Sequence, residues 1–133
     1  MAFLIDSDIL IYSLKGEKAV SSNFLKHETD AKYISVISYG ELLFGAHNSQ
    51  RIEKNLALVY KLRSLFKILE VDQAVMEIFA KLKAQNRKTG RTVDDLDLII
   101  AATALCNNLT LVTNNQKHFQ GIPGLMLTNW RSY

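Results

Sequence analysis

The sequence predicts an α/β fold in which a central, mainly parallel sheet is flanked by helices. Short apolar runs typical of buried strands alternate along the chain with longer segments of helical periodicity. Strands separated by helices are joined by crossover connections, and these make neighbouring strands parallel. The 133 residues suffice for one core and contain no internal repeat or Pro/Gly/Ser-rich linker, so we expect a single domain over residues 1–133.

The first half of the chain contains two of the predicted strands. Residues 2–6 are apolar until an aspartate interrupts them, and residues 33–38 are rich in β-branched side chains. Between and after these strands, the pattern predicts four helices with a stop at Gly16 and a start at Ser38. The four helices are expected over residues 8–16, 21–27, 38–47 and 51–66.

The second half of the chain predicts three further strands, over residues 66–71, 109–115 and 125–130. Asp72 is placed to cap the helix that follows the first of them, and Gly90 is placed to end that helix. Residues 92–108 predict a helix that has acids in its first turn and is apolar nearly all round. We expect this last helix to lie in the centre of the fold.

The composition limits the possible partners and cellular compartment of the protein. A formal net charge of +3 and a pI near 9.0 permit a nucleic-acid partner without requiring one. The single cysteine excludes an internal disulfide and fits a reducing compartment. The first apolar run has no basic stretch before it, and no apolar run approaches the ~20 residues of a membrane span. We therefore expect a soluble, cytoplasmic protein with no membrane segment.

Three acidic residues occupy comparable places in the predicted fold. Asp6 ends the first strand, Glu41 lies near the start of the helix after the second strand, and Asp97 opens the buried helix. Ligand sites in parallel sheets lie beyond the carboxyl ends of strands, so these acids are expected to converge there. Converging carboxylates repel one another unless a cation lies among them, and oxygen ligands suit Mg²⁺ or Mn²⁺. The three histidines are isolated in sequence, which disfavours a zinc site.

Each acidic position also has a purely structural interpretation. Ser38 and Glu41 have the spacing of a capping box, and Asp8 is placed to cap the helix after the first strand. The acids at 94–95 complement a helix dipole, which is the preferred interpretation for them. Asp97 is less well explained in this way, because a cap could have used its neighbours. The metal-site hypothesis therefore depends on the three acids occurring together.

Several segments resemble the motifs of PIN-domain nucleases. The segment FLIDSDILIYSLKG resembles their first motif, ISVISYGELLFGA resembles the second, and residues 95–130 are similar to the third and fourth in order and spacing. The similarity spans nearly the whole chain and is closest to the VapC-type toxins of bacterial toxin–antitoxin pairs. It implies a PIN-like three-layer sandwich and a Mg²⁺- or Mn²⁺-dependent endoribonuclease that leaves 5′-phosphate and 3′-hydroxyl ends.

The resemblance also assigns roles to individual residues. It implies that Asp6, Glu41 and Asp97 are the catalytic acids, with Asp6 and Asp97 as metal ligands. A metal held in this way lowers the pKa of a bound water and offsets charge that develops on the phosphate oxygens.

A second set of residues is implied to support these acids. Asn115 stands where many PIN domains have a fourth aspartate, and Thr113 matches the family threonine that orients the side chain at that position. Ser7 keeps a hydroxyl where the family usually has threonine, and Asp8 replaces its usual asparagine with an extra acid. Asp95 is the remaining supporting residue.

The segment at residues 81–91 is basic and contains no acid. One interpretation is a solvated helix end whose cations complement the helix dipole, and the other is a surface for the RNA backbone. Both can hold for the same residues, which are Lys81, Lys83, Arg87, Lys88 and Arg91. The resemblance further implies two protein partners, namely a second copy of the chain in a homodimer and a small VapB-type antitoxin whose C-terminal segment blocks the acidic crevice.

Three other functions remain compatible with parts of the sequence. The chain could be a housekeeping PIN nuclease, or a degenerate PIN domain that only binds RNA or protein, as Asn115 weakly suggests. The segment LIDSDI also fits a haloacid-dehalogenase-like phosphatase, with Asp6 as nucleophile and Asp8 as general acid/base. That family has its acidic pair after the Thr-Asn strand, whereas here VDDLD precedes it.

Overall fold

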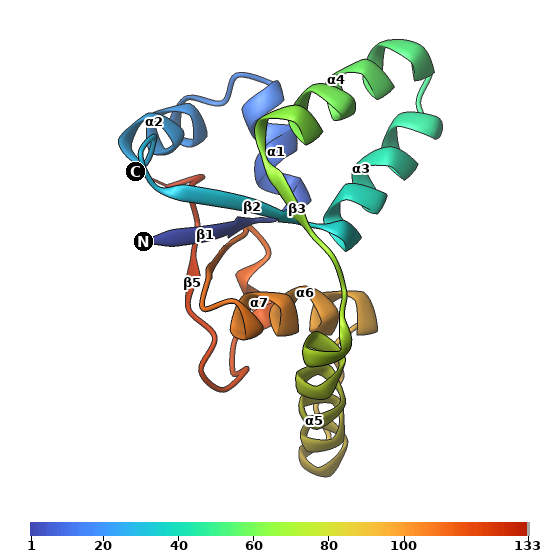
Figure 1. Cartoon of the computed structure of the whole chain (residues 1–133), viewed down its shortest axis with the longest axis vertical. Helices are drawn as coiled ribbons and strands as arrows, with labels where there is room; N and C mark the ends of the chain where they lie inside the picture. The colour runs from blue at the N-terminus through green and yellow to red at the C-terminus, as the bar shows by residue number, and fades with distance from the viewer. Residues whose placement is uncertain (133) are drawn as a thin grey trace.

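The computed structural model of the protein describes residues 1–132 and contains a five-stranded sheet in the order β3-β2-β1-β4-β5 (Figure 1). All neighbouring strands pair in parallel, which confirms the predicted sheet. The carboxyl ends of the strands therefore lie at one edge. The strands are β1 (Ala2–Ile5), β2 (Ala31–Ser35), β3 (Lys67–Leu69), β4 (Thr110–Val112) and β5 (Leu127–Thr128).

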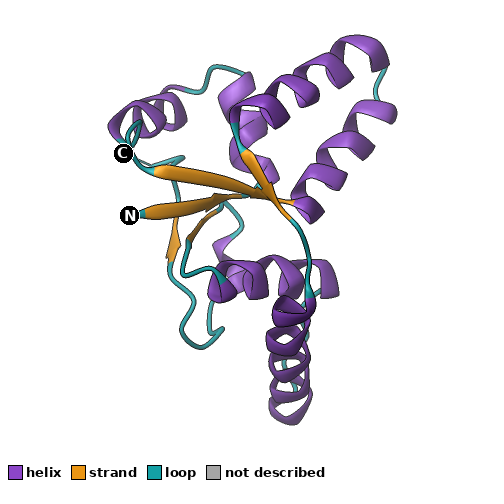
Figure 2. Cartoon of the chain, in the orientation of Figure 1, coloured by secondary structure: helices purple, strands orange, loops and turns teal. Residues whose placement is uncertain are grey.

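Helices cover both faces of this sheet, as Figure 2 shows. One layer contains α1 (Ser7–Leu14), α2 (Lys18–Lys26), α3 (Val36–His47) and α4 (Ile52–Leu65). The other layer contains α5 (Gln73–Thr89), α6 (Asp95–Cys106) and α7 (Gln116–Phe119). The arrangement is the α/β three-layer sandwich that the sequence predicts.

The central strand β1 supplies both halves of the core. Successive side chains of a strand point to opposite faces of its sheet. Phe3 and Ile5 accordingly belong to the apolar cluster under α1–α4, while Leu4 belongs to the cluster under α5–α7. Because every one of these side chains is at most 2% exposed, β1 is buried on both faces, as its unbroken apolar run predicts.

Two predicted helix boundaries are confirmed in atomic detail. The Asp72 carboxylate accepts a hydrogen bond from the Val75 backbone N–H at 3.0 Å and caps α5. Gly90 ends the same helix with a φ of 73°, a left-handed conformation that glycine adopts without steric cost.

The start of α3 differs from the prediction. The second strand ends at Ser35, whose hydroxyl accepts from the Ile37 N–H at 3.1 Å, so the helix begins at Val36. The expected start at Ser38 is therefore wrong, and so is the capping box between Ser38 and Glu41. Ser38 is instead a buried residue within the first turn, and Glu41 lies about one turn further into the helix.

The cap of α1 and several boundaries also differ from the prediction. Asp6, not Asp8, is the N-cap residue of α1, because its side chain accepts from the Ser7 N–H at 2.9 Å. The strands are shorter than the apolar runs that predicted them, and α2 begins three residues earlier, at Lys18. The short helix α7 was not expected from the sequence.

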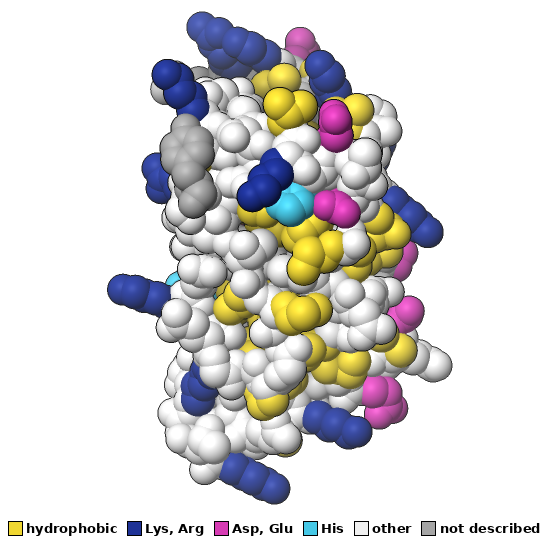
Figure 3. All heavy atoms as spheres, turned by 90° about the vertical axis from the view of Figure 1, so that its left-hand side faces the viewer, with side chains coloured by type: hydrophobic (Ala, Val, Ile, Leu, Met, Phe, Trp, Pro, Cys, Tyr) yellow, Lys and Arg dark blue, Asp and Glu magenta, His cyan; other side chains and the backbone are white. Residues whose placement is uncertain are grey.

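Within residues 1–132, no helix is both long enough and apolar enough to cross a bilayer. The face at which β1 begins, shown in Figure 3, carries cations around its margins and beside a histidine in its upper half, with acids mostly towards one side and apolar areas between them. This face shows no continuous basic surface. The carboxyl ends of the strands lie at the opposite edge of the sheet.

Candidate active site

Asp6 is the most enclosed acid of the predicted site and is only 7% exposed. It directly follows β1, and its own N–H donates to the Val112 carbonyl at 2.9 Å in the neighbouring strand. Its Oδ2 accepts from the Thr113 hydroxyl at 2.8 Å, and its Oδ1 accepts from the Ser38 hydroxyl at 3.3 Å. Burial raises the pKa of Asp6 and the hydrogen bonds oppose this rise. The side chain is thus held in one orientation by hydroxyl groups from α3 and from the segment that follows β4.

Glu41 lies close enough to Asp6 for their charges to interact. The Ser7 hydroxyl, next to Asp6 in the chain, donates to Glu41 Oε1 at 3.4 Å. The pKa of Glu41 is raised to about 7, first by burial and then by the negative charges of Asp6 and Asp97. The structure therefore brings together the three acids that the sequence selected from positions 6, 41 and 97.

Asp97 lies in the first turn of α6 and faces the short helix α7. Its Oδ2 is 3.1 Å from Nδ1 of His118. Burial is the largest cause of the raised pKa of Asp97, the charge of Asp6 adds to it, and His118 opposes it. The histidines are isolated in sequence, but the fold brings His118 against Asp97. The sequence did not select His118, because its contact with Asp97 requires α7, which is too short to leave a periodic pattern.

Asp8 connects the ends of β1 and β4. Its Oδ2 accepts from the Asn114 N–H at 3.0 Å, and its Oδ1 accepts from the Ile9 N–H at 2.7 Å. Burial, followed by the charge of Asp6, raises the pKa of Asp8 to about 6. Asp8 thus adds a further acid to the site and also anchors the turn that leads to α7.

Thr113 links Asp6 to the fourth position of the family pattern. Its hydroxyl donates to Asp6 and accepts from the Asn115 backbone N–H at 3.1 Å. The Asn115 residue is exposed at the start of α7 and makes no capping hydrogen bond with its side chain. Thr113 therefore positions the Asn115 main chain, and the Asn115 amide is left to face solvent.

The basic segment at 81–91 does not form one uniform surface. Lys83 of α5 forms an ion pair with Asp95 of α6 at 3.1 Å. Asp95 is therefore engaged away from the acid group, the name used here for Asp6, Glu41 and Asp97. Three of the remaining cations are exposed on α5, namely Lys81, Arg87 and Lys88. Arg91 differs from them, because it lines a depression together with Asp97.

The chemistry of these acids fits a divalent cation. Among residues 1–132, no group of three or more His, Cys, Asp or Glu side chains is placed to hold a metal ion. Mg²⁺, however, usually keeps several waters and binds through one or two carboxylates together with substrate oxygens. A cation between Asp6 and Asp97 would relieve the repulsion that contributes to the raised pKa values of Glu41 and Asp97.

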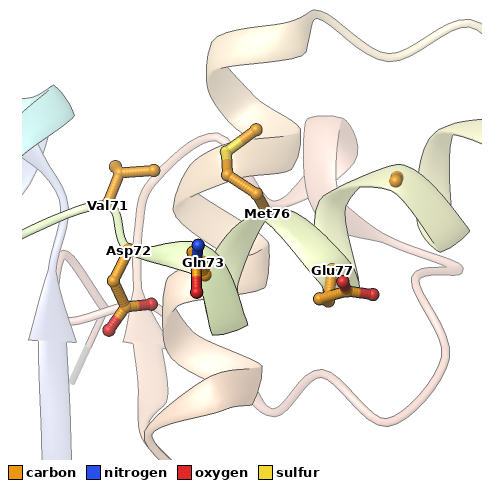
Figure 4. A pocket seen from close by; sticks show the side chains of 6 residues that line it. Val71, Asp72, Gln73, Met76 and Glu77 are labelled. Atoms are coloured by element: carbon orange, nitrogen blue, oxygen red, sulfur yellow. The ribbon is translucent and has the colours of Figure 1, made fainter.

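The acids border three depressions and take no part in a fourth. Asp97 lines one of about 240 Å³, and Glu41 lines two of about 370 and 620 Å³. The fourth, shown in Figure 4, lies along the start of α5, where the Asp72 and Glu77 side chains point to one side and Met76 to the other. None of the three predicted catalytic acids lines it, so we place the site at the first three depressions.

Comparison with known proteins agrees with this architecture. The family model described as PIN domain matches residues 3–125, and the chain therefore belongs to the PIN-domain family. Its curated relatives include the tRNA(fMet)-specific endonuclease VapC of Shigella flexneri, 30% identical over 130 residues that cover 98% of both chains. Ribonuclease VapC2 of Rickettsia felis is 31% identical over 134 residues and also covers 98% of both chains.

Solved structures show the same relationship. A toxin–antitoxin complex, VapBC2 of Rickettsia felis bound to a promoter DNA fragment, contains a chain that matches with a TM-score of 0.91 and 29% identity, over 98% of this chain and 99% of that one. DNA-bound VapBC of Salmonella typhimurium matches with a TM-score of 0.90 and 29% identity, over 98% of both chains. The resemblance to VapC-type PIN domains is thereby confirmed, and the phosphatase alternative loses its support.

Proposed function

We propose that this protein is the ribonuclease toxin of a VapBC-type toxin–antitoxin pair, and that it hydrolyses RNA phosphodiester bonds in the cytoplasm with Mg²⁺ or Mn²⁺. The observation that carries the proposal is the buried Asp6 carboxylate, held at the carboxyl end of β1 beside Glu41 and Asp97. The names of the relatives support the choice of RNA as substrate. We propose further that residues 1–133 act as one PIN domain.

The proposed mechanism gives each acid a separate task. Asp6 and Asp97 hold the cation, which when bound makes a water more acidic and offsets charge on the phosphate. Thr113 and Ser38 keep Asp6 in place, so its oxygens need little reorganisation. Glu41, whose pKa is raised in the metal-free protein first by burial and then by the neighbouring acids, is placed to take a proton from the attacking water.

Expression in cells separates a nuclease from a domain that only binds RNA. Induction of the wild-type protein is expected to inhibit growth and to create new RNA 5′ ends, mapped by sequencing of total RNA. Asp6→Asn is expected to do neither at equal protein level, because the proposed metal ligand loses its charge. Growth inhibition by Asp6→Asn equal to that of the wild type would identify a binding module and contradict the proposal.

Two apolar surfaces on either side of Glu41 fit the two expected partners. The depression of about 370 Å³ lies between α1, α3 and α4 and has mainly apolar walls, which include Ile11, Leu42 and Gly45. Since it reaches Glu41, a segment of a VapB-type antitoxin bound there would cover the acids, and the similar solved structures are toxin–antitoxin complexes. The depression of about 620 Å³ includes Phe44 and Leu96, which are 69% and 46% exposed. We assign this second surface to the homodimer.

Two glycines of α3 provide a matched test of these assignments. An added Cβ at Gly45 or Gly40 would meet no atom within 4 Å, so a larger side chain is accommodated and removes a helix-destabilising glycine. Gly45→Gln is expected to weaken antitoxin binding, measured by calorimetry, and to leave the dimer intact. Gly40→Gln is expected to shift the dimer towards monomer in analytical ultracentrifugation. Identical behaviour of the two variants would contradict the division into two surfaces.

A further inference from the structure

The depression beside Asp97 brings cationic side chains next to the acids. It has a volume of about 240 Å³ and is formed by the segment 91–94, Asp97 and the start of α7. Two cations, Arg91 and Lys117, line it together with His118, which faces Asp97. Because Asp97 belongs both to this depression and to the acid group, whatever occupies the depression lies next to the reacting centre.

Arg91 extends over Gly121, whose missing side chain leaves room for the guanidinium. A Cβ built on Gly121 would lie 2.2 Å from Arg91 Nη1, so the guanidinium occupies the space that any other residue at 121 would fill. The backbone N–H of Arg91 donates to the Asn86 carbonyl at 2.9 Å, and this hydrogen bond fixes the main chain just after α5. The Arg91 residue is half-buried and lines the depression.

The guanidinium nevertheless keeps its hydrogen-bonding capacity. Among residues 1–132, the structure records no ion pair and no side-chain hydrogen bond for Arg91, although Asp94 lines the same depression. Lys83, in the same basic segment, is paired with Asp95. A positioned arginine with free donors is suited to bidentate binding of a phosphate group.

We propose that Arg91 and Lys117 form a subsite for the RNA phosphate adjacent to the one that is cleaved. This inference rests on the proposed function and deepens it by naming the residues that hold the substrate backbone. An acidic centre repels a polyanion, and cations beside it offset that repulsion. If Asp97 held a metal ion, Asp94 would be the remaining acid of the depression, and Arg91 and Lys117 would be available to bind the neighbouring phosphate.

The test compares Arg91→Ala with Arg51→Ala, which removes an exposed arginine at the start of α4 that lines none of the depressions beside the acids. In cleavage of a single-stranded oligoribonucleotide that contains a mapped cleavage site, Arg91→Ala is expected to raise KM about tenfold, the effect of losing one charged hydrogen bond. RNA binding is measured in the Asp6→Asn background, where no cleavage is expected. There, adding Arg91→Ala should make the plot of log binding constant against log salt concentration less steep, by about 0.7 for one lost contact with single-stranded RNA. Arg51→Ala should leave both quantities near their wild-type values.

A chemically altered substrate locates the contact. Replacing single phosphates around the cleavage site by neutral methylphosphonates should weaken cleavage by the wild type at one adjacent position, and Arg91→Ala should be less sensitive than the wild type at that same position, because only Lys117 remains there. If the wild type cleaves the RNA but Arg91→Ala and Arg51→Ala have equal effects, the subsite is overturned and the proposed function stands. Failure of the wild type to cleave or bind any RNA would overturn both the subsite and the proposed function.

Discussion

Purified Asp6→Asn protein is expected to lose RNA cleavage by roughly a thousandfold and yet to melt at a higher temperature than the wild type in metal-free buffer. The loss follows because about 4 kcal/mol of charge stabilisation by a metal ion corresponds to that factor in rate. The gain in stability follows because Asp6 is buried and its charged form is disfavoured, as its raised pKa indicates.

An asparagine fits the hydrogen bonds that hold Asp6. Its amide oxygen can accept from the Ser7 N–H and the Ser38 hydroxyl, and its amide nitrogen can donate to the Thr113 hydroxyl. Glu28→Gln, which neutralises an exposed acid in the turn before β2, is the matched control and should change neither property. A lower melting temperature for Asp6→Asn would show that the carboxylate stabilises the fold, contrary to the geometry described above.

The melting temperature of the metal-free protein is expected to fall as the pH rises from about 5 to about 8. Asp8 and Glu41 have pKa values raised to about 6 and about 7, so the folded protein keeps protons that the unfolded chain has already released. Stability therefore decreases with rising pH through this range and levels off above the raised pKa values. Calorimetry or differential scanning fluorimetry in the presence of a chelator measures the effect.

Added Mg²⁺ is expected to reverse this loss. At a hundredfold excess over its dissociation constant a ligand stabilises the folded state by about 2.7 kcal/mol, and the shift should be larger at about pH 8 than at about pH 5 because protons compete for the same oxygens. Glu41→Gln should flatten the pH dependence. An increase in metal-free stability with pH over this range would mean that the acids do not interact as described.

The layers of the fold were predictable because they follow from local patterns. The apolar run of β1 and the all-round apolar surface of α6 each indicate burial without knowledge of their partners. The caps at Asp72 and Gly90 depend on neighbouring residues only, and both were found as expected.

The errors arose where a side chain is engaged by a distant part of the chain. Ser35 and Ser38 are equally good caps by sequence, and the choice depends on Asp6, which engages the Ser38 hydroxyl from 32 positions away. The contact of His118 with Asp97 spans 21 positions and requires α7, which is too short to leave a periodic pattern. Strand ends and helix starts identified the three acids, whereas the residues that hold them became visible only in three dimensions.

The place of β1 between β2 and β4 has a consequence for biosynthesis of the protein. The first strand leaves the ribosome early, but its second neighbour is residues 110–112, near the other end of the chain. The hydroxyl of Thr113 and the N–H of Asn114, which hold Asp6 and Asp8, arrive at the same late stage. A nascent or truncated polypeptide that ends before these residues lacks the contacts that order Asp6 and Asp8, so the proposed toxin activity is expected only after almost the whole message has been translated.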